Sequence, residues 1–225
     1  MVTNLAYFYE TSQKTRGGKW VWVKDSNGEM RGNVLLGGTI LNPKKGFDHL
    51  YAAQLVQYTP AQGCLIFRSF GVKTATSAAT DTTIYINGDG YGDAPEVGML
   101  IMKAPSAATG TGQSALVTNV VYDEANAQFA VTLSVALGAL AVGDILVEAA
   151  GSAASETATV LVPKPNTFVE ADRDLMPTEG YGLTGEANYS ISTVYNKQAW
   201  IARMQPLPAY VLANNRSLID GIFWI

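Results

Sequence analysis

The feature that most constrains the fold is a series of five short segments rich in apolar residues within residues 82–149, of which 115–122 and 128–133 alternate large apolar residues with small or polar ones. A period of two places successive side chains on opposite faces of a strand. Turns rich in glycine, asparagine and aspartate separate the segments, which is typical of consecutive antiparallel strands. We therefore predict a mainly β protein with a small antiparallel β-barrel or sandwich domain over residues 81–163. The expected strands are 82–86, 97–102, 115–122, 128–133 and 145–149.

The residues before this domain indicate β-hairpins. The aromatic and β-branched run 19–24 is followed by an Asn27-Gly28 turn, after which 29–36 is expected to return as the partner strand. A second hairpin is expected to join 50–58 to 64–72, with a helix over 48–57 as the alternative. A stretch of small residues then marks a boundary. We assign residues 1–80 to a basic, contact-making N-terminal region.

The last part of the chain, residues 164–225, is irregular and rich in proline and aromatic residues. Its final segment is strongly apolar, and such a segment needs cover either from the same subunit or from another chain. We therefore predict an extended C-terminal assembly region whose apolar side chains are buried in an oligomer or capsid contact. The residues expected there are Trp200, Leu207, Tyr210, Ile219, Ile222, Phe223, Trp224 and Ile225.

The charges are unevenly distributed along the sequence. Residues 1–80 carry nine basic and four acidic side chains, whereas residues 81–180 carry three basic and thirteen acidic ones. This asymmetry is consistent with complementary docking between copies, with a basic side facing an acidic partner, or with an ordinary mixed surface. The net charge of −4 argues against nucleic acid as a partner. The uncharged stretch 125–143 alternates like a strand, so we expect no membrane span, and residues 1–10 do not resemble a secretory signal.

Few residues are available for catalysis or metal binding. With one cysteine and one histidine, the chain lacks the ligands for a multi-Cys or multi-His metal centre. A Cys64–His49 nucleophile pair is the catalytic alternative, but Cys64 is better explained as a small buried apolar residue. The segment 87–93 resembles half of a calcium loop, although a polar turn between strands explains the same residues. We expect no enzymatic activity and no cofactor, and leave ion binding by 87–93 open.

The middle of the chain resembles the head fibre and head decoration (auxiliary capsid) proteins of tailed bacteriophages. The resemblance rests on a threonine-rich strand (81–84), on Val97-Gly98, on the alternating strand 131–133 and on the segment 142–149, which begins Val-Gly-Asp and ends Leu-Val-Glu-Ala. It extends through Gly37-Gly38-Thr39-Ile40, Val194-Tyr195-Asn196-Lys197 and Leu207-Pro208-Ala209-Tyr210-Val211.

This resemblance implies a non-catalytic virion protein that binds the outer surface of an icosahedral head and stabilises it. The implied partners are the major capsid protein, further copies of this chain in a homo-oligomer, with a trimer favoured, and another head fibre or auxiliary capsid protein. Synthesis would take place in the bacterial host cytoplasm. The alternative is a carbohydrate-binding or host-surface adhesion module of a virion that uses exposed aromatics such as Trp20 and Trp22.

Overall fold

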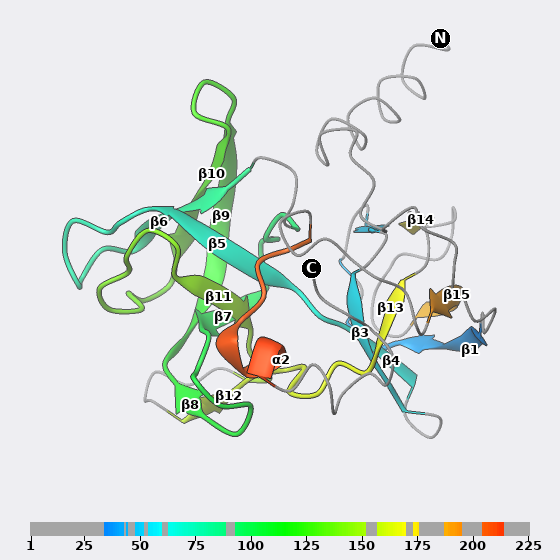
Figure 1. Ribbon diagram of the computed structural model, residues 1–225. Helices are drawn as coiled ribbons and strands as arrows, with labels where there is room; N and C mark the ends of the chain where they lie inside the picture. The colour runs from blue at the N-terminus through cyan, green and yellow to red at the C-terminus, as the bar shows by residue number, and fades with distance from the viewer. Residues whose placement is uncertain are drawn as a thin grey trace, which may run out of the picture. The chain divides into compact units, whose positions relative to one another are not determined.

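The computed structural model is mainly β, and the chain divides into two compact units (Figure 1). The first unit is built around Arg68–Leu161 and Ala202–Pro208, and the second around Val21–Phe67, Val162–Ile201 and Ala209–Ile225. The residues that the structure describes are 34–42, 44, 48–51, 54–59, 63–88, 93–151, 157–169, 173–175, 187–194 and 204–213.

A six-stranded antiparallel sheet forms the first unit. Each strand pairs with two neighbours, in the order β10-β6-β5-β11-β7-β9, and β9 pairs again with β10. The ladder shifts register at Lys73 in β5 and at Thr118 in β9, so the sheet is not a regular barrel. The strands are β5 (Ser69–Thr74), β6 (Thr83–Asn87), β7 (Leu100–Lys103), β9 (Ser114–Asp123), β10 (Gln128–Leu133) and β11 (Ile145–Glu148).

Alternation along these strands builds one apolar core. The inward-facing residues of β6 and β10 are Ile84, Ile86, Val131 and Leu133, and all four are buried while their neighbours along each strand are more exposed. Burying side chains of this size provides the main driving force for closing the sheet. The cluster is completed by Phe70, Val72, Ile101, Ala115, Val117, Leu140 and Leu146.

Two Val-Gly turns lie in the loops that lead into β7 and β11. Gly98 and Gly143 both have positive φ, at 96° and 87°, which disfavours any residue with a Cβ. Gly98 donates its amide to the carbonyl of Val117, and Gly143 donates to Val72. The repeated Val-Gly pattern on which the resemblance partly rests is therefore a pair of turns that tie loops to neighbouring strands. A small two-stranded sheet, β8 (Thr111–Gly112) with β12 (Ala158–Thr159), lies in the same unit.

The second unit contains a five-stranded sheet in the order β1-β15-β13-β3-β4, and β4 meets β1 again at one parallel pair, Ile40 with Cys64. A separate two-stranded sheet joins β2 to β14. The short helix α2 (Ala209–Ala213) belongs to this unit. The strands are β1 (Val34–Ile40), β2 (Asp48–Leu50), β3 (Leu55–Thr59), β4 (Gly63–Ile66), β13 (Thr167–Val169), β14 (Arg173–Leu175) and β15 (Ala187–Val194).

All five strands predicted between residues 82 and 149 are present and antiparallel. The hairpin predicted around residues 59–63 is confirmed as β3–β4, and the helix considered for 48–57 is wrong, because β2 and part of β3 occupy that stretch. The second strand of this hairpin, predicted over 64–72, is shorter than expected. It ends at Ile66, and β5 instead enters the six-stranded sheet between β6 and β11.

Candidate functional site

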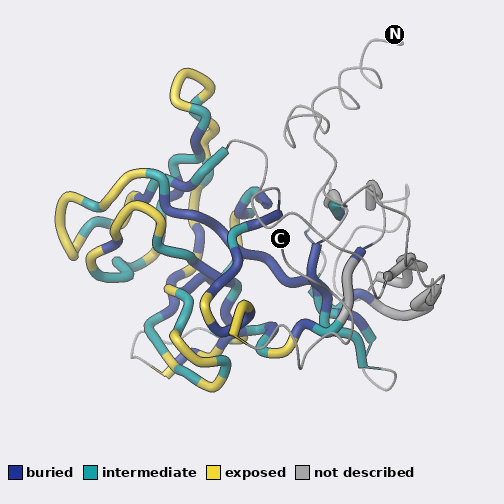
Figure 2. The backbone as a smooth tube through the Cα atoms, in the orientation of Figure 1, coloured by how far each residue is buried: buried dark blue, intermediate teal, exposed yellow. Residues whose placement is uncertain are grey.

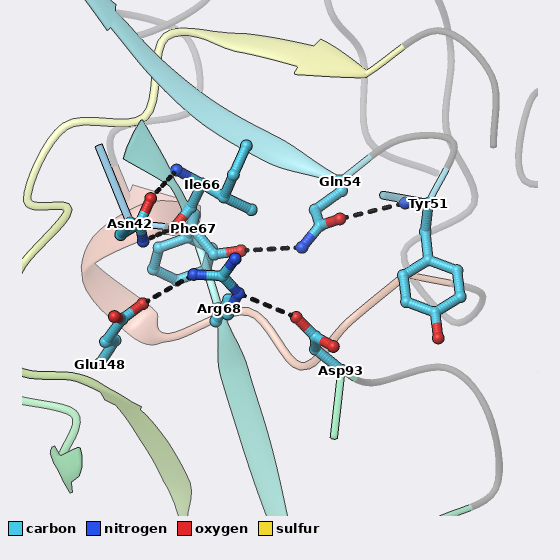
Figure 3. A network of polar contacts seen from close by, with 8 residues as sticks. All are labelled: Asn42, Tyr51, Gln54, Ile66, Phe67, Arg68, Asp93 and Glu148. Carbon is cyan, nitrogen blue, oxygen red and sulfur yellow. Dashed lines mark hydrogen bonds and ion pairs between the residues drawn. The ribbon is translucent and has the colours of Figure 1, made fainter. Parts of the chain in front are cut away.

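A buried arginine held by two carboxylates is the main polar cluster of the first unit (Figure 3). The Nε atom of Arg68 lies 3.2 Å from a carboxylate oxygen of Asp93, and its Nη1 atom lies 3.2 Å from Glu148. The side chains of Arg68 and Asp93 are only 1% and 3% exposed, and that of Glu148 is 14% exposed. Charges removed from water to this extent are tolerated only when they are paired.

This cluster brings together three separate parts of the chain. Arg68 directly precedes β5, Glu148 ends β11, and Asp93 follows the loop after β6. A guanidinium stays protonated at any pH a protein meets, so Arg68 offers no proton for general acid–base chemistry. Both carboxylates face the same cation. The arrangement is suited to fixing the ends of two strands and a loop, and this structural role is the one we assign to it.

The hairpin formed by β9 and β10 carries the most exposed apolar side chains of the sheet near its turn. Val121 is 53% exposed and Tyr122 is 50% exposed. In Figures 1 and 2, the turn between these strands extends away from the rest of the sheet as an exposed loop. The ring of Tyr122 packs against that of Phe129 on the opposite strand, with centroids 5.0 Å apart. This aromatic pair therefore extends the apolar core toward the hairpin end, with Phe129 partly buried and Tyr122 half exposed.

Two polar side chains hold this turn in one conformation. Asp123 accepts hydrogen bonds from the side-chain amides of Asn126, at 2.7 Å, and Gln128, at 3.1 Å. Lys73, the extra residue of the β5 bulge, donates to the carbonyls of Asn126 and Ala127. A bulge commonly redirects a side chain in this way. The hairpin end is therefore a rigid feature, and a rigid surface loses little entropy when it binds a partner.

The hydrogen bond from the Asn126 amide lowers the pKa of the Asp123 carboxyl, and the bond from Gln128 adds to this effect. Asp123 therefore stays ionised well into the acidic range. Glu124, the next residue, is exposed. The end of the hairpin thus combines apolar side chains with an acidic turn.

Most of the C-terminal residues that the structure describes are buried within the single chain, whereas Ala209, Leu212 and Ala213 of α2 are exposed. Met204–Pro208 belongs to the first unit, where the hydroxyl of Ser69 donates to the carbonyl of Pro206. Leu207 is buried. Tyr210, which lies in α2 and belongs to the second unit, is also buried. The expected interface role of both residues stays a prediction. Trp200, Ile219, Ile222, Phe223, Trp224 and Ile225 lie outside the described residues, as do Trp20 and Trp22.

The structure explains Cys64 as part of the core of the second unit. The thiol is buried among Ile40, Val56 and Ile66, as the sequence indicated. Burial raises the pKa of this thiol to about 12, so the reactive thiolate is scarce near neutral pH. The side chain of His49 lies outside the described residues.

The segment 87–93, considered for ion binding, is described only at its ends. At one end Asp93 faces Arg68, and at the other the amide of Gly88 donates to the carbonyl of Ala127. Within the ranges given above, acidic, cysteine and histidine side chains nowhere gather in a group of three or more that could hold a metal ion. A search of the same ranges finds no helix with the length and apolar character needed to cross a membrane.

Sequence reasoning missed the Arg68 cluster and two asparagine contacts of the second unit. The side-chain amide of Asn42 exchanges two hydrogen bonds with the backbone of Ile66, at 2.8 and 2.9 Å (Figure 3). Asn166 does the same with Tyr58 at the same two distances. The side chain of each asparagine hydrogen-bonds to the backbone of the β3–β4 hairpin in the way that a residue of a neighbouring strand would. Asn166 follows Pro165, and this pairing with a strand carried no recognisable sequence signal.

Comparison with known proteins adds no relative. No protein-family model matches this sequence, and none of the curated proteins does so either.

Proposed function

We propose that this chain is a structural protein of a tailed-phage head, which binds the outer surface of the capsid and reinforces it without catalysis. The observation that carries the proposal is that the strand pattern resembling head decoration proteins forms one continuous sheet, with its Val-Gly repeats as turns. We also propose that this sheet is an irregular version of the small barrel expected for such a protein.

The exposed surface of the first unit supports a role in binding other proteins. A rigid hairpin end with two half-exposed apolar side chains, Val121 and Tyr122, offers a contact that water solvates poorly. Buried aromatic and aliphatic anchors commonly provide most of the energy of a protein interface. Hydrogen bonds of Lys73 and Asp123 hold the hairpin end, so the contact surface is organised before binding.

The proposed assembly is a homo-oligomer, with a trimer favoured, attached to the major capsid protein and, where present, to another head fibre or auxiliary capsid protein. Multivalent attachment to a symmetric lattice gives strong overall binding from weak individual contacts. The C-terminal residues Leu207 and Tyr210, together with 219–225, remain our proposed assembly region. Leu207 and Tyr210 are already buried within one chain, so their proposed contribution to assembly is to stabilise the fold that presents this region.

Co-sedimentation tests the proposal. Purified protein is mixed with phage heads that lack it, and the heads are pelleted and examined by electron microscopy. We expect saturable binding at regular surface positions and an oligomer in solution by light scattering. A chain that stays in the supernatant, or that binds surface glycans in an array while ignoring heads, contradicts it.

A further inference from the structure

The outer edge of β9 is an open strand edge near the end of the hairpin. On one side, β9 pairs with β10 as far as Asp123. On the other side, its pairing with β7 ends at Leu116, and the last backbone hydrogen bonds join Val117 to Gly98 and Met99. Beyond Val117, no strand within the described residues pairs with this edge. Alternate backbone N–H and C=O groups of residues 118–122 therefore face outward.

This edge of β9 is accessible to solvent, and the opposite edge of β9 is hydrogen-bonded to β10. β10 pairs with β6 over residues 128–132, so β9 is the outer member of three hydrogen-bonded strands. Four of its five residues from 118 to 122 are exposed. The extra residue Thr118 donates its hydroxyl to the carbonyl of Thr132, which fixes the start of the open edge. Proteins usually protect such an edge with charges or cover it.

The side chains along the edge define the kind of segment that fits. Val121 and Tyr122 are neighbours in a strand, so they present apolar surface on both faces of the hairpin. Asp123 and Glu124 place two acidic side chains just past the edge. A matching segment is therefore extended, has large apolar side chains on both faces, carries a basic residue at the end that lies beside the acidic turn and spans about five residues.

One segment of this chain has that composition. Residues 19–24 read Lys-Trp-Val-Trp-Val-Lys, with a lysine at each end and four β-forming apolar residues between them. Lys14 and Arg16 add further positive charge shortly before it. We propose that residues 19–24 of a second copy add as a strand to the open edge of β9. Backbone hydrogen bonds provide affinity in this mode, and the alternate side chains provide specificity.

This inference deepens the homo-oligomer part of the proposed function by naming a contact between copies. It predicts that self-association weakens as salt increases, because salt screens the attraction between the lysines of one copy and the acidic turn of the other. The donor segment and the acceptor edge are different surfaces, so the copies associate either by reciprocal exchange of the two segments in a two-fold dimer or head to tail in a ring.

Disulfide trapping between purified full-length proteins tests the contact. The only native cysteine, Cys64, is buried with a raised pKa, so it interferes little. One protein carries Val121→Cys or Tyr122→Cys, which cover the two faces of the edge, and the other carries Val21→Cys or Val23→Cys. The matched control is Val142→Cys, a valine that is 67% exposed in the turn before β11.

We expect the mixed proteins to form a covalent dimer with a yield several-fold above that of the Val142→Cys control. Yields equal to the control overturn the proposal. A bond that forms only when both cysteines are in one chain also overturns it, because the occupant is then the protein's own segment. The measurement needs no capsid, so its outcome is independent of whether the protein binds heads.

A second pair of variants guards against misfolding. Val121→Glu adds negative charge beside Asp123 and Glu124 and is expected to reduce the oligomer mass measured by light scattering, whereas Val142→Glu leaves it unchanged. Both proteins must retain the thermal transition of the parent. A protein with Lys19→Glu and Lys24→Glu and a protein with Glu124→Lys are each expected to associate weakly alone. Mixing the two proteins is expected to restore association. Equal oligomer masses for the two glutamate variants, or no rescue by the charge exchange, contradict the contact.

Discussion

The guanidinium of Arg68 lies 3.2 Å from the carboxylate of Asp93, and both side chains are almost completely buried. Replacing one member of such a pair leaves the other charge in a poorly solvating environment. We predict that Arg68→Ala lowers the free energy of unfolding by about 3–5 kcal/mol, as measured by urea denaturation. Lys103→Ala is the control, because the ion pair of Lys103 with Asp144 is partly exposed to solvent and exposed pairs contribute about 0–1 kcal/mol. Equal effects from the two substitutions contradict the role assigned to Arg68.

The contact between β5 and the C-terminal segment leads to a prediction at Gly71. A Cβ at this position would lie 3.3 Å from Cγ of Pro206 and 3.1 Å from the side-chain nitrogen of Asn87. We expect Gly71→Val to destabilise the protein by about 1–3 kcal/mol through overpacking, measured as a shift of the denaturation midpoint. Gly151→Val is the comparison, since a Cβ there meets no atom within 4 Å. If both variants unfold at the same midpoint, Met204–Pro208 does not pack on β5 as described.

Burial of Cys64 predicts low reactivity in the folded protein. The pKa of the thiol is raised to about 12, from an ordinary value of 9.0, because the core of the second unit desolvates the thiolate. Folding therefore favours the protonated thiol, and this contribution to stability is present below pH 9 and lost as the pH rises through 12. We expect native protein at pH 8 to resist a thiol-labelling reagent and urea-unfolded protein to react fully. Rapid labelling of the native protein would show that Cys64 is accessible.

Two aspartates predict the opposite dependence in acid. The backbone amide of Ala78 and then the hydroxyl of Ser77 lower the pKa of Asp81, and the amide of Asn126 lowers that of Asp123. Both values lie below the ordinary 3.8, so folding favours the carboxylates. Their contribution to stability is present above that pH and lost as the pH falls through the folded values. Titration of both carboxyls followed by NMR should give midpoints below 3.8, and unshifted midpoints would show that the turns are not formed.

The sequence was most informative where structure is local. Short apolar runs, alternating in 115–122 and 128–133, predicted the five strands of residues 82–149, and Asn or Gly at the turns marked their ends. The β5 strand was assigned to the wrong hairpin because its pattern runs on from β4 without a turn residue. The partners of β5, which are β6 and β11, are set by tertiary packing.

The candidate site was harder to predict, because its contacts join distant residues. Arg68 and Glu148 are separated by 80 positions, and nothing in the residues around either one indicates a partner. The same holds for Asn166 and Tyr58, which are 108 positions apart. The open edge of β9 could not be predicted from the sequence either. The residue at which β9 stops pairing with β7 depends on the length of β7 and on the Val97-Gly98 turn. Composition did indicate the basic and acidic regions on which the proposed contact between copies depends.

The most direct test of the account is to locate the chain in particles of the tailed phage that we propose encodes it. Intact virions are labelled with antibodies raised against the purified protein, and the gold-tagged particles are examined by electron microscopy. The account predicts label distributed over the outer surface of the head, at many symmetric positions, and lost from heads assembled without this chain. Label confined to the tail, or its absence from intact particles, would contradict the proposal that the protein decorates the capsid.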